Sequence, residues 1–146
     1  MEKFKGALMV GVLRLFAKLP WGAVQRVGAG IGWLMWKVPN GSRNVVRINL
    51  AKCFPEMDPV AREQLVGQAL RDIGKSFVES ACAWIWPPQR SLELVKEVHG
   101  LEVLEQALAS GKGVVGITSH LGNWEVLNHF YCNQCKPIIF YRPPKL

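Results

Sequence analysis

The first twenty residues follow the pattern of a helix with one apolar and one basic side. Apolar side chains recur every three to four positions on the first side: Phe4, Leu8, Val12, Leu15 and Leu19. Lys3, Arg14 and Lys18 gather on the opposite side. An apolar face opposite cations is typical of a helix that lies in the membrane interface, with its cations on anionic headgroups. Pro20 is predicted to end or bend this helix.

The uncharged runs of this region are short. Residues 6–13 and 27–36 each fall below the ~20 apolar residues that a spanning helix needs. The second run contains Trp33 and Trp36, whose amphipathic rings suit the headgroup layer. We therefore predict that residues 1–38 associate with a membrane surface. A tilted span over residues 6–19 is one alternative, and two core helices of a larger protein are another.

A long helix is predicted in the middle of the chain. Asp58 has the character of an N-cap, Pro59 suits the first helical position, and Pro87 and Pro88 close the segment. Apolar residues step by four along one predicted face: Leu65, Ala69, Ile73, Phe77, Ala81 and Ile85. Asn40, followed by glycine, is a turn signal before this helix.

Charged side chains of the middle segment are expected to face water. On the helix these are Arg62, Glu63, Arg71, Asp72 and Lys75. Glu79 is the exception, because it lies beside the predicted apolar face. Arg43 and Arg47 could hold a phosphate, although the sequence favours solvated side chains.

The last third of the chain has the pattern of alternating strands and helices. Three segments have the apolar character of strands: 94–98, 114–118 and 137–141. Between them, a short helix with Leu101, Leu104 and Leu108 ends at Gly111, and a second helix runs from Asn123 to about Cys132. Because a strand, a crossover helix and another strand make a parallel unit, we predict an α/β fold with a mainly parallel sheet flanked by helices. The predicted domains are 1–38, membrane-associating, and 39–146.

His120 and Glu125 are the candidate catalytic pair. In open parallel sheets the site forms beyond the carboxyl ends of the strands, and His120 follows the predicted strand that ends at Thr118. A carboxylate that accepts a hydrogen bond from one ring nitrogen leaves the other nitrogen free to act as a base. Gly122 allows a tight turn, and Trp124 could exclude water. No Ser or Cys lies at a nucleophile spacing, so the base would activate a substrate hydroxyl; a structural histidine is the alternative.

The composition of the chain limits the classes of partner that it is expected to bind. The chain has 18 Lys and Arg against 11 Asp and Glu, for a net charge of +7, which favours anionic partners. Nucleic acid is set aside, because no basic stripe is interleaved with aromatics. Four cysteines without a signal-peptide pattern indicate free thiols in a reducing compartment. His129, Cys132 and Cys135 have a spacing that could hold zinc, although ordinary thiols and no metal are favoured.

Three segments carry a family resemblance. GKGVVGITSHLGNWE, residues 111–125, closely resembles the His-x4-Asp/Glu block of the lipid A biosynthesis acyltransferases, the late lauroyl/myristoyl-type enzymes of Gram-negative bacteria. These enzymes belong to the wider glycerolipid acyltransferase-like superfamily. RINLAKCFPEMD, residues 47–58, and FYRPPKL, residues 140–146, resemble the blocks upstream and downstream of it. The resemblance covers nearly the whole chain.

This resemblance implies a function and a set of site residues. His120 would be the catalytic base and Glu125 its orienting partner, while Asn123, Trp124 and Arg142 would bind substrate. An acyl group would pass from acyl carrier protein to a hydroxyl of a Kdo-bearing lipid A precursor, without a cofactor. The enzyme would work among anionic lipids on the cytoplasmic face of the bacterial inner membrane.

Length is where this sequence departs from the family. Members of the family continue well beyond this point, with further strands and acyl-chain pocket elements. The chain is therefore expected to be a truncated form or the front part of a split sequence. An inactive membrane-associated fragment is the alternative.

Overall fold

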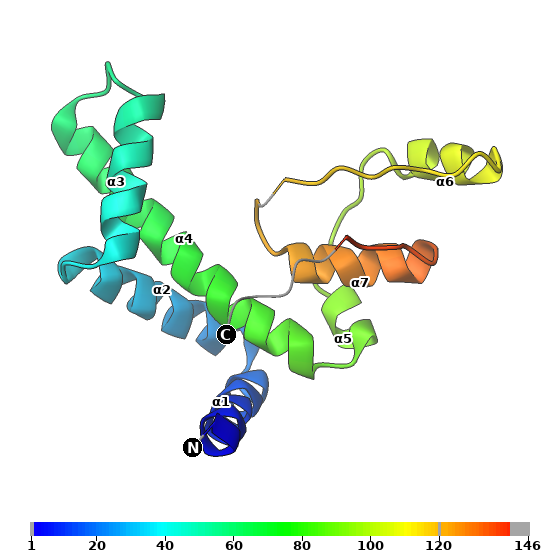
Figure 1. Ribbon diagram of the computed structural model, residues 1–146, viewed down its shortest axis with the longest axis horizontal. Coiled ribbons are helices and arrows are strands. Elements are labelled where there is room, and N and C mark those ends of the chain that lie inside the picture. The colour runs from blue at the N-terminus through cyan, green and yellow to red at the C-terminus, as the bar shows by residue number, and fades with distance from the viewer. Residues whose placement is uncertain (1, 120, 141–146) are drawn as a thin grey trace. The chain divides into compact units, whose positions relative to one another are not determined.

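The computed structural model describes residues 2–119 and 121–140, with side chains from residue 6 onward (Figure 1). Contacts divide the chain into two compact units, Met1–Trp86 and Pro87–Leu146, here called unit 1 and unit 2. Every regular element of the described residues is a helix. The sequence-based division into residues 1–38 and 39–146 rests on predicted function and stays a prediction.

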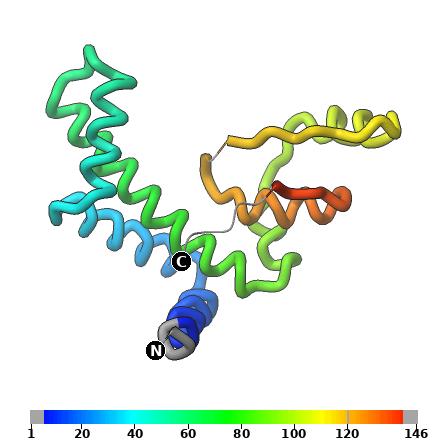
Figure 2. Tube along the Cα trace, in the orientation of Figure 1, coloured from blue at the N-terminus to red at the C-terminus, as the bar shows by residue number. Residues whose placement is uncertain are grey.

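The predicted α/β fold with a parallel sheet is wrong for the described residues, because none of them forms a strand. The described residues of the three expected strand segments, 94–98, 114–118 and 137–140, lie outside the helices. Figure 2 shows residues 112–119 as an extended run. Val115, Ile117 and Ile138 are 91%, 95% and 92% exposed. An apolar extended run becomes a strand only when another segment satisfies its backbone groups and covers its faces. The described residues supply neither.

Unit 1 consists of four helices. They are α1 (Glu2–Ala17), α2 (Trp21–Lys37), α3 (Gly41–Cys53) and α4 (Pro59–Ile85). In Figure 1, α3 and the first part of α4 form a hairpin, and α1, α2 and α3 all contact α4. Pro20 separates α1 from α2, as the sequence predicts. The helix α3 follows the turn signal at Asn40, whose side chain accepts a hydrogen bond from the Arg43 amide at 2.9 Å.

The predicted boundaries of α4 are confirmed. The Asp58 carboxylate accepts hydrogen bonds from the amides of Val60 and Ala61, both at 2.9 Å, which satisfies two of the free N–H groups at the start of the helix. Pro59 occupies the first turn, and α4 ends at Ile85, before the two prolines. Capping and proline placement therefore set both ends locally.

The predicted buried face of α4 is wrong by one position for its large side chains, although Ala81 is buried as predicted. Ile73 is 44% and Phe77 64% exposed. The row that is buried lies one residue further along the helix: Val66, Leu70, Gly74, Val78 and Cys82. Both rows step by four, and the exposed row carries the larger side chains. The buried row is set by close packing, which a count of large apolar residues does not detect.

The close packing joins α2 to α4 backbone against backbone. A Cβ atom added to Gly32 would lie 2.2 Å from the Leu70 carbonyl oxygen, and one added to Gly74 would lie 2.2 Å from that of Gly28. Both distances are far inside van der Waals contact. Glycines therefore let the two helix axes approach, and Val24 and Leu70 are buried beside this crossing.

A tryptophan corner ties α1 to the end of α4. Trp86 is buried, and its indole N–H donates to the Ala17 carbonyl oxygen at 2.7 Å. Its ring packs against Trp21, with 6.0 Å between centroids and a 51° interplanar angle. The hydrogen bond satisfies a carbonyl at the end of α1, and the ring pair covers the joint with apolar area.

Glu63 and Glu79 of α4 accept hydrogen bonds from side chains of other helices. Glu79 accepts a hydrogen bond from the Gln25 side chain in α2, so it is an exception to the solvated face, as the sequence indicates. Glu63 is not solvated as predicted: it accepts hydrogen bonds from Trp36 in α2 at 2.8 Å and from Arg47 in α3 at 2.8 and 2.6 Å. Polar contacts thus join α2, α3 and α4 around Glu63.

The described part of unit 2 contains three shorter helices. They are α5 (Pro88–Leu92), α6 (Leu101–Ala109) and α7 (Trp124–Gln134). Both α6 and α7 begin where the sequence predicts, and α5 packs against α7. Ser110 caps α6, and Gly111 follows with a φ of +69°, the left-handed conformation expected after a helix end.

None of the helices in the described residues is both long and apolar enough to span a bilayer.

Candidate functional site

The start of α7 positions the candidate carboxylate. The Asn123 side-chain oxygen accepts hydrogen bonds from the amides of Glu125 at 3.1 Å and Val126 at 3.2 Å. Asn123 is therefore the N-cap of α7, and Glu125 lies in the first turn. A helix N-terminus favours negative charge. The cap thus fixes the backbone from which the Glu125 carboxylate projects.

The turn before α7 is made by glycine. Gly122 has a φ of +70°, which a residue with a Cβ atom adopts only with strain. Leu121 is 85% exposed, and Trp124 is also exposed. That Trp124 excludes water from the site stays a prediction.

Two predicted site residues, His120 and Arg142, lie outside the described residues. Their geometry relative to Glu125 therefore stays a prediction. Of the five predicted site residues, the structure describes Asn123, Trp124 and Glu125, which are consecutive at the start of α7. Asn123 has a structural role as a cap, and its role in substrate binding stays a prediction.

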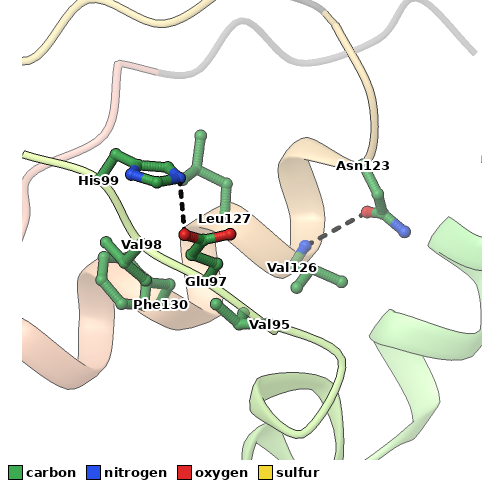
Figure 3. A pocket seen from close by; sticks show the side chains of 8 residues that line it. All are labelled: Val95, Glu97, Val98, His99, Asn123, Val126, Leu127 and Phe130. Carbon is green, nitrogen blue, oxygen red and sulfur yellow. Dashed lines mark hydrogen bonds and ion pairs between the residues drawn. The ribbon is translucent and has the colours of Figure 1, made fainter.

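A cavity of about 360 Å³ lies beside the cap, between α7 and the segment before α6 (Figure 3). Its lining is mainly apolar: Val95, Glu97, Val98, His99, Asn123, Val126, Leu127 and Phe130. Figure 3 shows Glu97 and His99 directed toward each other, and 3.1 Å separates His99 Nε2 from Glu97 Oε1. Both side chains are largely exposed, so this contact contributes little stability.

The sequence interpretation missed this cavity. One signal for it was present: Val126, Leu127 and Phe130 recur at helical spacing, so they form an apolar side of α7. The opposite wall comes from Val95, Glu97, Val98 and His99, and the sequence predicts a strand of a sheet over residues 94–98. Because those residues are not in a sheet, their apolar side chains face α7 instead.

The described residues do not form the zinc site that the spacing of His129, Cys132 and Cys135 could have given. Within residues 2–119 and 121–140, no three His, Cys, Asp or Glu side chains converge where a metal ion could be held. His129, Cys132 and Cys135 all belong to this part of the chain. All four cysteines are free thiols. The Nδ1 atom of His129 is buried and has no hydrogen-bond partner in the structure.

Comparison with known proteins identifies the family. The family model for bacterial lipid A biosynthesis acyltransferases matches residues 2–145. The chain belongs to this family. It is 31% identical to the lipid A biosynthesis lauroyltransferase of Escherichia coli over 136 residues, and 30% identical to the palmitoleoyltransferase of the same organism over 135 residues. These alignments cover 93% and 92% of this chain.

The family assignment agrees with the resemblance seen in the sequence. A lipid A biosynthesis acyltransferase from Haemophilus influenzae is 32% identical over 112 residues, which is 75% of this chain. The chain spans less than half the length of these relatives: 44% of the two Escherichia coli proteins and 36% of the Haemophilus protein. No solved structure matches the chain.

Proposed function

We propose that the protein takes part in acyl transfer to a lipid A precursor, with acyl carrier protein as the acyl donor. The observation that carries this proposal is the family match over residues 2–145, which includes the candidate pair His120 and Glu125. The placement of Glu125 in the first turn of α7, held by the Asn123 cap, supports its role beside a base.

The proposed chemistry needs a base and no covalent acyl-enzyme. Neutral His120 takes the proton of the acceptor hydroxyl as its oxygen attacks the thioester carbonyl. The carbon–sulfur bond then breaks, and the imidazolium returns the proton to the departing thiolate of the carrier. Glu125 orients the imidazole and stabilises its positive charge during the attack. Arg142 and Trp124 would contact the acceptor, whose anionic groups match a chain of net charge +7.

The proposed place of work is the cytoplasmic face of the inner membrane. Support comes from α1, where Leu8, Met9 and Leu15 are exposed together with the cation Arg14, and Lys18 is exposed directly after the helix. Exposed apolar side chains beside cations favour adsorption to anionic lipid, each cation contributing about 1 kcal/mol near the surface. Changing Leu8 and Leu15 to Glu should therefore shift the protein from the membrane pellet to the supernatant.

A membrane-associated protein without turnover is the second candidate. One observation favours it: Val115 and Ile117, just before the candidate base, are almost fully exposed. A catalytic geometry requires its residues to be held within a fraction of an ångström by rigid neighbours. The described residues give this segment no such neighbours.

An acyl-transfer assay separates the two candidates. The 146-residue chain, reconstituted in anionic vesicles, is mixed with acyl carrier protein that bears a radiolabelled acyl chain and with a lipid A precursor, and labelled lipid is counted. General-base catalysis contributes ~10²–10⁴-fold, so His120→Ala should lose at least about 100-fold. Glu125→Ala should lose less, because the base remains.

The matched controls are Glu102→Ala, which removes a first-turn acid from α6, and His129→Ala. Both should keep normal transfer. Transfer that survives His120→Ala would refute the catalytic assignment. Vesicle binding without any transfer by the unaltered chain would establish the second candidate.

A further inference from the structure

A cluster in unit 1 holds more cations than its single acid can pair. At its centre Glu63 accepts three hydrogen bonds, from Trp36 Nε1 and from Arg47 Nε and Nη2. Both carboxylate oxygens are therefore engaged, at distances of 2.6 to 2.8 Å. A carboxylate has about four acceptor sites, so these three hydrogen bonds leave Glu63 little capacity for a further cation.

Arg43 is such a cation. Its Nη2 atom lies 3.9 Å from Glu63 Oε1, beyond hydrogen-bond distance, although its side chain is only 17% exposed. Its Nε atom is buried and has no hydrogen-bond partner in the structure. A guanidinium is always charged and carries five N–H donors, and a buried donor without an acceptor is costly. The geometry at Arg43 therefore lacks one acceptor.

Two more cations lie against the Trp36 ring. Lys37 Nζ is 4.1 Å from the ring centroid, and the Arg71 guanidinium carbon is 5.5 Å from it. The ring itself is held against α4, because a Cβ atom added to Gly67 would lie 3.0 Å from it. Trp36 is thus a fixed platform for cations from α2 and α4, next to those of α3.

We propose that this cluster, formed by Trp36, Lys37, Arg43, Arg47, Glu63 and Arg71, binds the phosphate group of an anionic lipid. Four cations against one acid leave an excess of three positive charges. A guanidinium matches a phosphate with two parallel hydrogen bonds, and Arg43 has the unused donors for it.

The surroundings of the cluster favour a lipid phosphate over a free one. Trp33 and Leu34 lie one helical turn before Trp36 and Lys37, and they are 47% and 56% exposed. An exposed tryptophan beside phosphate-binding cations suits the headgroup layer, where its ring contacts apolar and polar groups together. This inference gives a location to the membrane contact proposed above, and it does not depend on acyl transfer.

Charge-preserving variants test the cluster. Arg43→Lys keeps the positive charge but removes the guanidinium fork, and Arg26→Lys makes the same change at an exposed arginine of α2 outside the cluster. Binding of the full chain to phosphatidylglycerol vesicles is measured by flotation, with phosphatidylcholine vesicles as the neutral reference. Because hydrogen bonds between charged groups are strong, Arg43→Lys should weaken binding about tenfold and Arg26→Lys should leave it unchanged.

The source of the phosphate is resolved by NMR of the Arg43 Nε–H signal. If inorganic phosphate shifts the signal, the phosphate group suffices for binding. If only phosphatidylglycerol shifts it, the lipid is needed. Either result supports the site. Equal vesicle binding by Arg43→Lys and the unaltered chain, or no shift with either probe, overturns it. Because these measurements detect binding, they stay informative if the acyl-transfer assay fails.

Discussion

Unit 1 has a buried apolar core between its helices, whereas the described part of unit 2 has no buried apolar residue. In unit 1, Val24, Val66, Leu70 and Val78 are buried between helices. In the described part of unit 2, Ser91 is the one buried residue, and its hydroxyl has no hydrogen-bond partner in the structure. The two regions have similarly apolar segments, so hydrophobicity alone does not explain the difference.

The difference lies in where each segment finds its backbone partners. A helix satisfies its N–H and C=O groups within its own segment, so it needs neighbours only for its apolar face. A strand needs another strand for its backbone and further cover for both faces. Residues 114–118 have the sequence of a buried strand but no partner in the described residues. Unit 1 therefore forms a buried core from its own helices, whereas residues 114–118 remain exposed.

Amide hydrogen exchange should give the largest contrast between the two regions. Amides of α4 around Leu70 should exchange only on global unfolding, which costs about 5 kcal/mol or more. Amides of residues 114–118 should exchange at nearly the rate of an unfolded chain. We expect the two rates, corrected for sequence, to differ by at least about 10³-fold.

The helix α7 provides an internal reference for this measurement. Its amides should show intermediate protection, because it is hydrogen-bonded but not deeply buried. Strong protection of residues 114–118 in the 146-residue chain would mean that they are paired after all, and the contrast between the units would be lost.

Much of unit 1 follows from its sequence, because its signals are local. Asp58 and Pro59 predict the start of α4, and two prolines predict its end. The buried face of α4 was not predicted, since Gly74 and Gly67 count for little on a hydrophobicity scale. Their importance comes from α2, which approaches within backbone contact, and a sequence pattern in one helix does not reveal its partner.

The candidate site follows from the sequence only in part. The start of α7 and the place of Glu125 in its first turn could be predicted, because an N-cap is a local signal. The cavity wall beside α7 could not be predicted, since residues 94–98 were expected to form a strand of a sheet. The cluster around Glu63 was missed as well, because it joins three helices through contacts distant in sequence.

Substitution of the crossing glycines should give the next largest effect. In Gly32→Ala the new Cβ atom would overlap the Leu70 carbonyl, so α2 and α4 must separate along their contact. Overpacking of this kind costs about 1–3 kcal/mol, and here the obstacle is backbone, so about 3 kcal/mol is expected. Urea unfolding followed by circular dichroism would measure the loss.

A glycine on the open side of the same helix is the control. Gly30 has nothing within 4 Å of an added Cβ atom. Gly30→Ala should therefore stabilise unit 1 by up to about 1 kcal/mol, through helix propensity alone. If both variants changed the stability equally, the close approach of α2 and α4 would not be what holds unit 1 together.

Asn123 allows capping and substrate binding to be separated in unit 2. Asn123→Ala removes the cap of α7 and should cost about 1 kcal/mol of local stability, visible as faster amide exchange at Val126. Asn123→Asp restores a capping oxygen, so exchange should return to normal. If acyl transfer recovers together with exchange, Asn123 acts through the cap; loss of transfer with normal exchange would show that the amide contacts substrate.

The smallest expected effect is a pH dependence of unit 1 that originates at Glu63. Hydrogen bonds from Arg47 hold the pKa of this carboxyl below its ordinary value of 4.5, although burial acts in the opposite direction, and Trp36 contributes to the lowering. A lowered pKa in the folded state means that the ionised form stabilises the fold. This contribution is complete above pH 4.5 and is lost as the pH falls through the folded-state pKa.

The size of this effect is limited by solvent. The Glu63 side chain is 37% exposed, so less than about 1 kcal/mol is expected. Glu63→Gln keeps a hydrogen-bond acceptor but cannot ionise, and the difference in unfolding free energy between the two proteins should shrink as the pH is lowered from 6 to about 3. Asp72→Asn, at an exposed pair with Lys75, is the matched control and should show a smaller change, because both partners are on the surface of one helix. A constant difference between Glu63→Gln and the unaltered protein over this range would show that Arg47 and Trp36 hold Glu63 by shape rather than by charge.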